Sequence, residues 1–118
     1  MMIKHSILMT AEEYFAVKNY LVELRSQGKL DNDKFIQKFY QAFAIDSCIK
    51  IDRGNRLFDN PICTVEFSLE NNQTMLSTIG LFCREHAMDQ NRKNPQLAKA
   101  LTDLKNYIAS ELLDFLGL

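Results

Sequence analysis

The sequence predicts an α+β fold that is mostly helical, and three observations support this prediction. Two stretches within the first 43 residues carry apolar side chains at the spacing of a helix face, and two stretches after residue 73 do the same. Between these pairs, residues 62–69 alternate apolar and polar side chains, which is typical of a strand with one buried face. The predicted order is an αα-hairpin, a small antiparallel β-hairpin and two further helices, of which the C-terminal one is long.

The first helix is predicted to begin after Thr10 and to end at Gly28. Thr10 and Glu13 have the spacing of a capping box, and glycine readily takes the left-handed conformation that ends many helices. Apolar side chains on both sides of the main face make it wider than one neighbouring helix would cover. The main face consists of Tyr14, Val17, Leu21 and Leu24, and the flanking residues are Phe15, Tyr20 and Val22.

A second helix follows after a short connection, which predicts that the two helices pack as antiparallel neighbours. Asp31 is the expected N-cap, because an aspartate before a helix accepts hydrogen bonds from the free N–H groups of its first turn. The expected buried face is mostly aromatic and consists of Phe35, Ile36, Phe39, Tyr40 and Phe43.

The middle of the chain allows two interpretations. Residues 53–55 and 59–61 are rich in Gly, Asn, Asp and Pro, which predicts loops. The alternating segment 62–69 then favours a strand, with residues 48–52 as its antiparallel partner. However, Asn60 followed by Pro61 is also a good helix start. A helix there would give an all-α bundle, which is the alternative to the α+β fold.

Two further helices are predicted from Thr74 onward. The first has Met75, Ile79, Phe82 and Cys83 on one face. The second begins at Asn94 and Pro95, a capping residue followed by proline at the first helical position. Its apolar face extends over Leu97, Leu101, Leu104, Ile108, Leu112 and Phe115, with Leu113 and Leu116 beside that face.

Composition indicates a single domain that spans residues 1–118. A chain of 118 residues with 47% hydrophobic and 25% charged residues is typical of one globular unit. The formal net charge of -1 provides no general attraction to nucleic acid or to an anionic membrane. No apolar run approaches the length of a membrane span. The three irregularly spaced cysteines do not resemble a disulfide framework, so a reduced, cytoplasmic protein is expected.

Cys83 and His86 are the residues closest to catalytic chemistry. On a helix they would be neighbours, and a histidine beside a thiol can help to generate a thiolate nucleophile. Both also lie on the apolar face of their helix, where a buried cysteine behaves as a small hydrophobe. We expect burial, and a small Cys/His-dependent hydrolase or transferase is the alternative function.

Metal and nucleic-acid binding find weaker support in the sequence. A zinc site would have to combine Cys83 and His86 with Cys48 and Cys63, whose spacing is not that of paired zinc ligands. A nucleic-acid-associated regulator is a lower-ranked alternative, because acidic residues dilute the basic turn near the last helix. That turn contains Arg84, Arg92, Lys93 and Lys99.

The predicted function is a non-enzymatic protein-binding module: an inhibitor of the immunity or antitoxin type, an anti-defence factor or an adaptor. Surplus apolar side chains on the first and last helices support this prediction, because clustered exposed apolar residues usually mark interfaces. The partner would be a protein, either a second copy in a homodimer or another chain. No catalytic, cofactor-binding or metal residue is assigned. The predicted interface consists of Phe15, Tyr20, Val22, Leu113 and Leu116.

Overall fold

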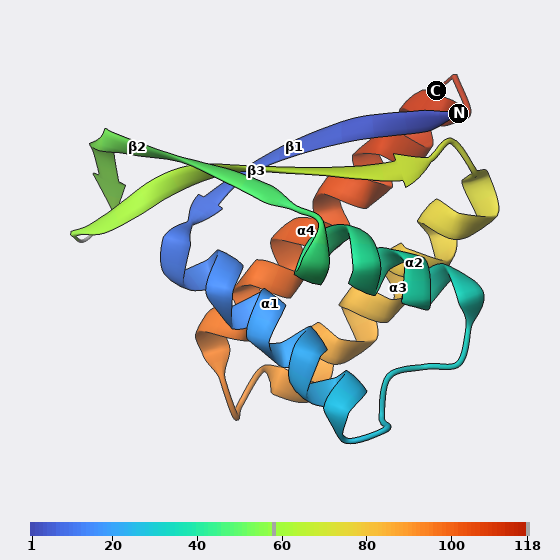
Figure 1. Cartoon of the computed structure of the whole chain (residues 1–118), viewed down its shortest axis with the longest axis horizontal. Coiled ribbons are helices and arrows are strands. Elements are labelled where there is room, and N and C mark those ends of the chain that lie inside the picture. Colours follow the sequence, from blue (N-terminus) through green and yellow to red (C-terminus); the bar gives the residue numbers. More distant parts are fainter. Residues whose placement is uncertain (58, 118) are drawn as a thin grey trace.

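The computed structural model describes residues 1–57 and 59–117, and it confirms the α+β fold. Along the chain, strand β1 is followed by helices α1, α2 and η1, then by strands β2 and β3, and finally by helices α3 and α4. The three strands form one antiparallel sheet in the order β1-β3-β2, and the helices cover one of its faces (Figure 1). Because residues 60–70 form a strand, the all-α alternative is wrong.

Strand β1 (Met2–Thr10) is the element that the sequence interpretation missed, so the predicted two-stranded hairpin is part of a three-stranded sheet. It pairs with β3 along its whole length, from Met2 opposite Glu70 to Thr10 opposite Ile62. Its side chains alternate between the two sheet faces, and those that face the helices are His5, Ile7 and Met9.

Helix α1 (Ala11–Ser26) has the predicted ends and the predicted buried face. The Thr10 side chain accepts the Glu13 N–H at 3.1 Å, and a Glu13 carboxylate oxygen accepts the Thr10 N–H at 3.0 Å, so the capping box is complete. Gly28 follows the helix with a φ of 68°, the left-handed conformation expected of a terminating glycine. The buried apolar residues are Tyr14, Val17, Leu21 and Leu24.

Helix α2 (Lys34–Tyr40) continues without a break into a π-helical turn, η1 (Gln41–Ile45). Asp33, rather than Asp31, is the N-cap, and its carboxylate accepts the Phe35 N–H at 2.7 Å. Helix α2 packs against α3, whereas η1 packs against α1 and β3. Phe43 in η1 joins this packing to the sheet, since its ring lies 5.5 Å from that of Phe67.

Strands β2 (Cys48–Leu57) and β3 (Asn60–Glu70) form the predicted antiparallel hairpin. Residues 53–55, predicted as a loop, lie within β2, where the register with β3 shifts between Asp52 and Arg56. The glycine and asparagine of this segment therefore mark an irregularity in the ladder rather than the end of the strand. The hairpin turn comes later and includes Asp59, whose φ is 63°.

Helices α3 (Gln73–Gln90) and α4 (Pro95–Phe115) pack extensively against each other beneath the sheet. Asn72 and Asn94 cap their N-termini through side-chain oxygens. The apolar face of α4 is buried from Leu97 to Ile108 and becomes more exposed towards Phe115. None of the helices in the described part of the chain is long and apolar enough to cross a membrane.

Candidate protein-binding site

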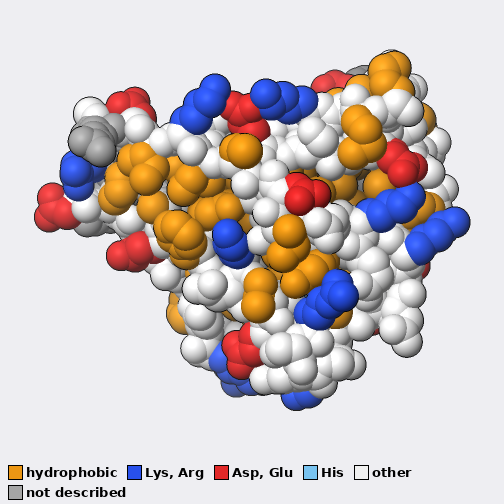
Figure 2. Space-filling view, viewed as in Figure 1, with side chains coloured by type: hydrophobic (Ala, Val, Ile, Leu, Met, Phe, Trp, Pro, Cys, Tyr) orange, Lys and Arg blue, Asp and Glu red, His pale blue; other side chains and the backbone are white. Residues whose placement is uncertain are grey.

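The predicted interface residues do not form one patch. Phe15 and Val22 are exposed on α1, and Figure 2 shows apolar side chains around the β2–β3 hairpin and the start of α1. Leu113 and Leu116 are exposed at the far end of α4. Helix α1 meets the first turns of α4, where Lys99 contacts Glu13, and Leu113 lies fourteen positions after Lys99 along α4. That length corresponds to about 21 Å of helix, so the two pairs lie in different places.

Tyr20 connects α1 to α3 and is only partly exposed. Its hydroxyl is hydrogen-bonded to Nδ1 of His86, and its ring meets the histidine ring edge-on. The histidine ring also packs against Phe82, with the ring centres 4.2 Å apart. Burial lowers the pKa of His86, so the imidazole favours its neutral form in this setting. Tyr20 therefore belongs to the packing between helices rather than to a free surface.

Cys83 and His86 do not form a nucleophile and base pair in this fold. The Cys83 side chain is completely buried, and burial raises its pKa to about 12. Among the described residues, no hydrogen bond joins the thiol to His86, whose Nδ1 is already bonded to Tyr20. A protonated thiol without access to substrate has the character of a core residue.

The other two cysteines lie on opposite faces of the sheet. Cys48 is exposed and lies opposite Glu66 on the face that the helices leave uncovered. Cys63 is buried on the helix side, where its thiol donates to the Met9 carbonyl oxygen at 3.3 Å. Within residues 1–57 and 59–117, no three His, Cys, Asp or Glu side chains are grouped so that they could hold a metal ion.

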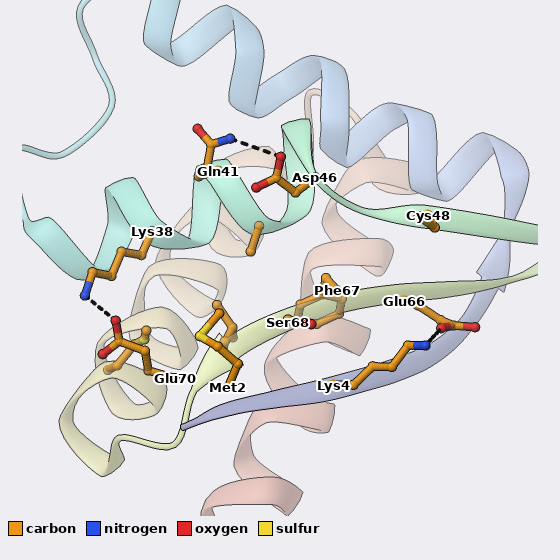
Figure 3. Close-up of a pocket in the computed structure, with 13 residues that line it drawn as sticks. Met2, Lys4, Lys38, Gln41, Asp46, Cys48, Glu66, Phe67, Ser68 and Glu70 are labelled. Atoms are coloured by element: carbon orange, nitrogen blue, oxygen red, sulfur yellow. Dashed lines mark hydrogen bonds and ion pairs between the residues drawn. The ribbon is translucent and has the colours of Figure 1, made fainter.

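A groove runs beside the second half of β3 (Figure 3). Strand β2 pairs with β3 only as far as Glu66, so residues 67–70 have no neighbouring strand on that side in the described part of the chain. Helix α2 and η1 supply the opposite wall, and the groove between them has a volume of about 360 Å³. Its apolar lining includes four buried or nearly buried residues: Ala42, Phe67, Leu69 and Met75.

The register of the sheet shows which main-chain groups of β3 face this groove. The Asn71 N–H donates to the Met1 carbonyl oxygen at 2.9 Å, just beyond the Glu70–Met2 pair. In an antiparallel ladder, hydrogen-bonded and non-hydrogen-bonded pairs alternate. Leu69 and Phe67 therefore direct their main-chain groups at β1, and those of Ser68 and Glu70 point away from it, towards the groove.

Charged pairs border the groove at both ends (Figure 3). Lys38 on α2 reaches the Glu70 carboxylate at 2.7 Å, and Lys4 on β1 is paired with Glu66. The hydrogen bond from Lys38 holds the pKa of Glu70 below its usual range, so the pair is ionised at neutral pH. Both partners in the Lys38–Glu70 pair are exposed, and such pairs contribute little to stability. A binding segment could therefore displace this contact at small cost.

Comparisons with known protein families, with curated proteins and with solved structures find no match to this chain. The function is therefore inferred from the geometry alone. Sequence reasoning missed the groove because β3, α2 and η1 build it together. The sequence contains one indication of a free strand edge. The predicted partner strand, residues 48–52, is shorter than the alternating segment 62–69, so part of that segment would have no partner in the predicted hairpin.

Proposed function

We propose that this protein is a non-enzymatic protein-binding module that holds an extended segment of a partner chain along the free edge of β3. The observation behind the proposal is the main chain of Ser68 and Glu70, which has no partner strand on its outer side among the described residues and faces a groove with an apolar floor. The complement of such an edge is another extended backbone, which would continue the sheet beside β3 where β2 leaves it.

The groove gives this edge a specificity that a bare edge lacks. Main-chain hydrogen bonds supply affinity in strand addition, and pockets for alternate side chains supply the choice of partner. Here the second wall comes from α2 and η1, and the apolar lining at Ala42 and Leu69 favours small or slender apolar side chains. The outer edges of β1 and β2 are also unpaired in the described sheet. The edge of β3 differs from them because its free main-chain N–H groups face the groove.

The partner is a second copy of the chain or another protein, as expected for an inhibitor, an antitoxin-type protein, an anti-defence factor or an adaptor. A homodimer would be visible by sedimentation at micromolar concentration. If the exposed end of α4 forms that dimer, Leu113→Asp and Leu116→Asp should convert it to a monomer. The proposal retains a cytoplasmic location, because an exposed free thiol such as Cys48 is typical of reducing compartments.

The test begins with peptides of random sequence displayed on phage and selected on the wild-type protein. Cys48 lines the groove and is exposed, so a fluorophore attached there reports the binding of each selected peptide. Ser68→Pro removes the N–H that faces the groove and leaves the ladder to β1 intact, since proline is tolerated where the N–H points away from the neighbouring strand. We expect at least a tenfold loss of affinity in this variant.

Leu8→Pro is the matched control, because the register also directs the Leu8 N–H away from β3, on the outer edge of β1. This control should bind as the wild type does, and circular dichroism verifies that both variants fold. Hydrogen exchange gives a second readout: the Ser68 and Glu70 amides should exchange rapidly in the free protein and become protected with peptide. Selection of no binding peptide, or equal affinity in both proline variants, would refute the proposal.

A further inference from the structure

A second apolar surface lies on the outer side of the α3–α4 pair, away from the β3 groove. Two adjoining hollows of about 320 Å³ and 540 Å³ follow the line where the two helices meet, and Arg84 and Lys105 border both. We call this surface the α3–α4 seam. It shares no lining residue with the groove beside β3, so a role for the seam goes beyond the proposed function.

The seam has the shape of an acceptor for a helix. Small residues, among them Gly80 and Ala109, line its central part, and a β-carbon at Gly80 would meet the Ile108 side chain at 3.5 Å. Leu81 and Met88 stand on one wall with exposed fractions of 55% and 68%. On α4, residues 105, 109, 112 and 116 follow one another at helical spacing, so the stripe leads to Leu116.

The charges along the seam have one sign. Arg84, Lys99 and Lys105 are the charged residues among its lining, although the chain as a whole has a net charge of -1. Lys99 is neutralised by Glu13 and Asp103. Within the described residues, Arg84 and Lys105 have no acidic partner. Two cations without acidic partners among the described residues, Arg84 and Lys105, beside the apolar α3–α4 seam are complementary to a partner that is apolar on one side and acidic on its flanks.

We infer that the α3–α4 seam binds an acidic amphipathic helix of a partner protein. A helix satisfies its own main-chain hydrogen bonds, which suits a surface built from two helices whose main-chain groups are already paired. The hollows extend from Leu76 in α3 to Asn91 at its C-cap, which corresponds to about 22 Å, the length of a helix of about fifteen residues. Such a helix would place leucine-type side chains on the Gly80–Ala109 floor and carboxylates beside Arg84 and Lys105.

The experiment uses a displayed library of sixteen-residue helices with a fixed leucine stripe and an equal mixture of Glu and Lys at the flanking positions. Selection on the wild-type protein should enrich Glu at these positions. Binding of a selected peptide, measured by fluorescence anisotropy, should weaken roughly 10- to 100-fold in the Arg84→Glu, Lys105→Glu double variant. Leu81→Asp should abolish it.

The matched control is the Arg92→Glu, Lys93→Glu double variant, which makes the same change in net charge in the turn after α3. It should bind the peptide as the wild type does, and circular dichroism verifies the folding of each variant. A selection without any binding helix, an equal retention of Glu and Lys, or an equal loss in the control would overturn the inference. A twenty-nucleotide single-stranded DNA that binds more tightly than any selected peptide, and depends on Arg84 and Lys105, would assign the seam to nucleic acid instead.

Discussion

The three thiols should differ sharply in their reaction with a disulfide reagent, because only Cys48 is exposed in the described structure. With Ellman's reagent at pH 8, one equivalent should react at the rate of an ordinary surface thiol. Cys63 and Cys83 have no exposed area, so their thiols can react with the reagent only after the structure opens. A domain with about 5 kcal/mol of stability is open in roughly one molecule in 5,000, so their reaction should be slower by at least about that factor.

Burial adds a second barrier to reaction at Cys83 without complete opening. A thiol with a pKa of about 12 holds about a thousandth of the thiolate that a thiol with the ordinary value of 9.0 holds at pH 8. The assay compares wild type with Cys48→Ser, in which the fast phase should vanish, and with protein unfolded in urea, in which all three thiols should react. A second fast thiol that disappears in Cys83→Ala would refute this reasoning and revive the Cys/His-dependent enzyme.

Substitution at Cys83 tests the same environment through stability. Cys83→Ala removes one fully buried sulfur and should lower the free energy of unfolding by about 1–2 kcal/mol. Cys83→Ser is closer in shape, but it buries a hydroxyl where the thiol has no hydrogen-bond partner among the described residues, at a further cost of about 1–3 kcal/mol. Urea unfolding should therefore rank wild type above Ala and Ala above Ser, and a serine variant as stable as wild type would contradict the assignment.

Three further predictions concern stability. Burial lowers the pKa of both His5 and His86, so as the pH falls the unfolded chain, whose histidines have pKa values near 6.5, binds protons before the folded protein does. The free energy of unfolding should therefore fall as the pH drops below about 6.5. Urea midpoints that do not fall between pH 7.5 and pH 5.5 would contradict this. Gly28→Ala should cost about 1 kcal/mol, because alanine disfavours a φ of 68° and nothing nearby obstructs its methyl group; an unchanged melting temperature would argue against that conformation. Thr10→Ala should cost about 1 kcal/mol by removing the acceptor for the Glu13 N–H, and the same change at half-buried Thr78 in the interior of α3 is the control that should cost less.

Local chemistry was sufficient to predict both ends of α1 and the start of α4, whereas the N-cap of α2 is Asp33 rather than the predicted Asp31. The Thr10–Glu13 capping box, the left-handed Gly28 and the Asn94–Pro95 start each act over a few residues, and each is visible in the sequence. The alternation in residues 62–69 likewise identified β3, because its buried and exposed faces follow a period of two.

The missed features depend on contacts between distant residues. The buried face of β1 contains His5, a polar residue that is satisfied by a 2.9 Å hydrogen bond to Tyr107, 102 positions away. In β2, the ladder with β3 overrides the loop preference of residues 53–55 and accommodates it as a shift of register. The β3 groove and the α3–α4 seam are likewise assembled from several elements, so neither surface is visible in one stretch of sequence.

The position of β3 in the sheet has a consequence for the order of events when the chain is made. β3 is synthesised last of the three strands, yet β1 and β2 each pair with it and not with each other. At a synthesis rate of roughly 5–20 residues per second, β3 is completed on the order of 3–12 s after β1, since about 60 residues separate the paired residues. No part of the sheet can form before β3 emerges from the ribosome, and the apolar faces of α1 and α2 remain without α3 and α4 for longer still. Until then, these apolar faces stay exposed in the nascent chain, and the arrival of residues 60–70 allows β1 and β2 to pair on either side of β3.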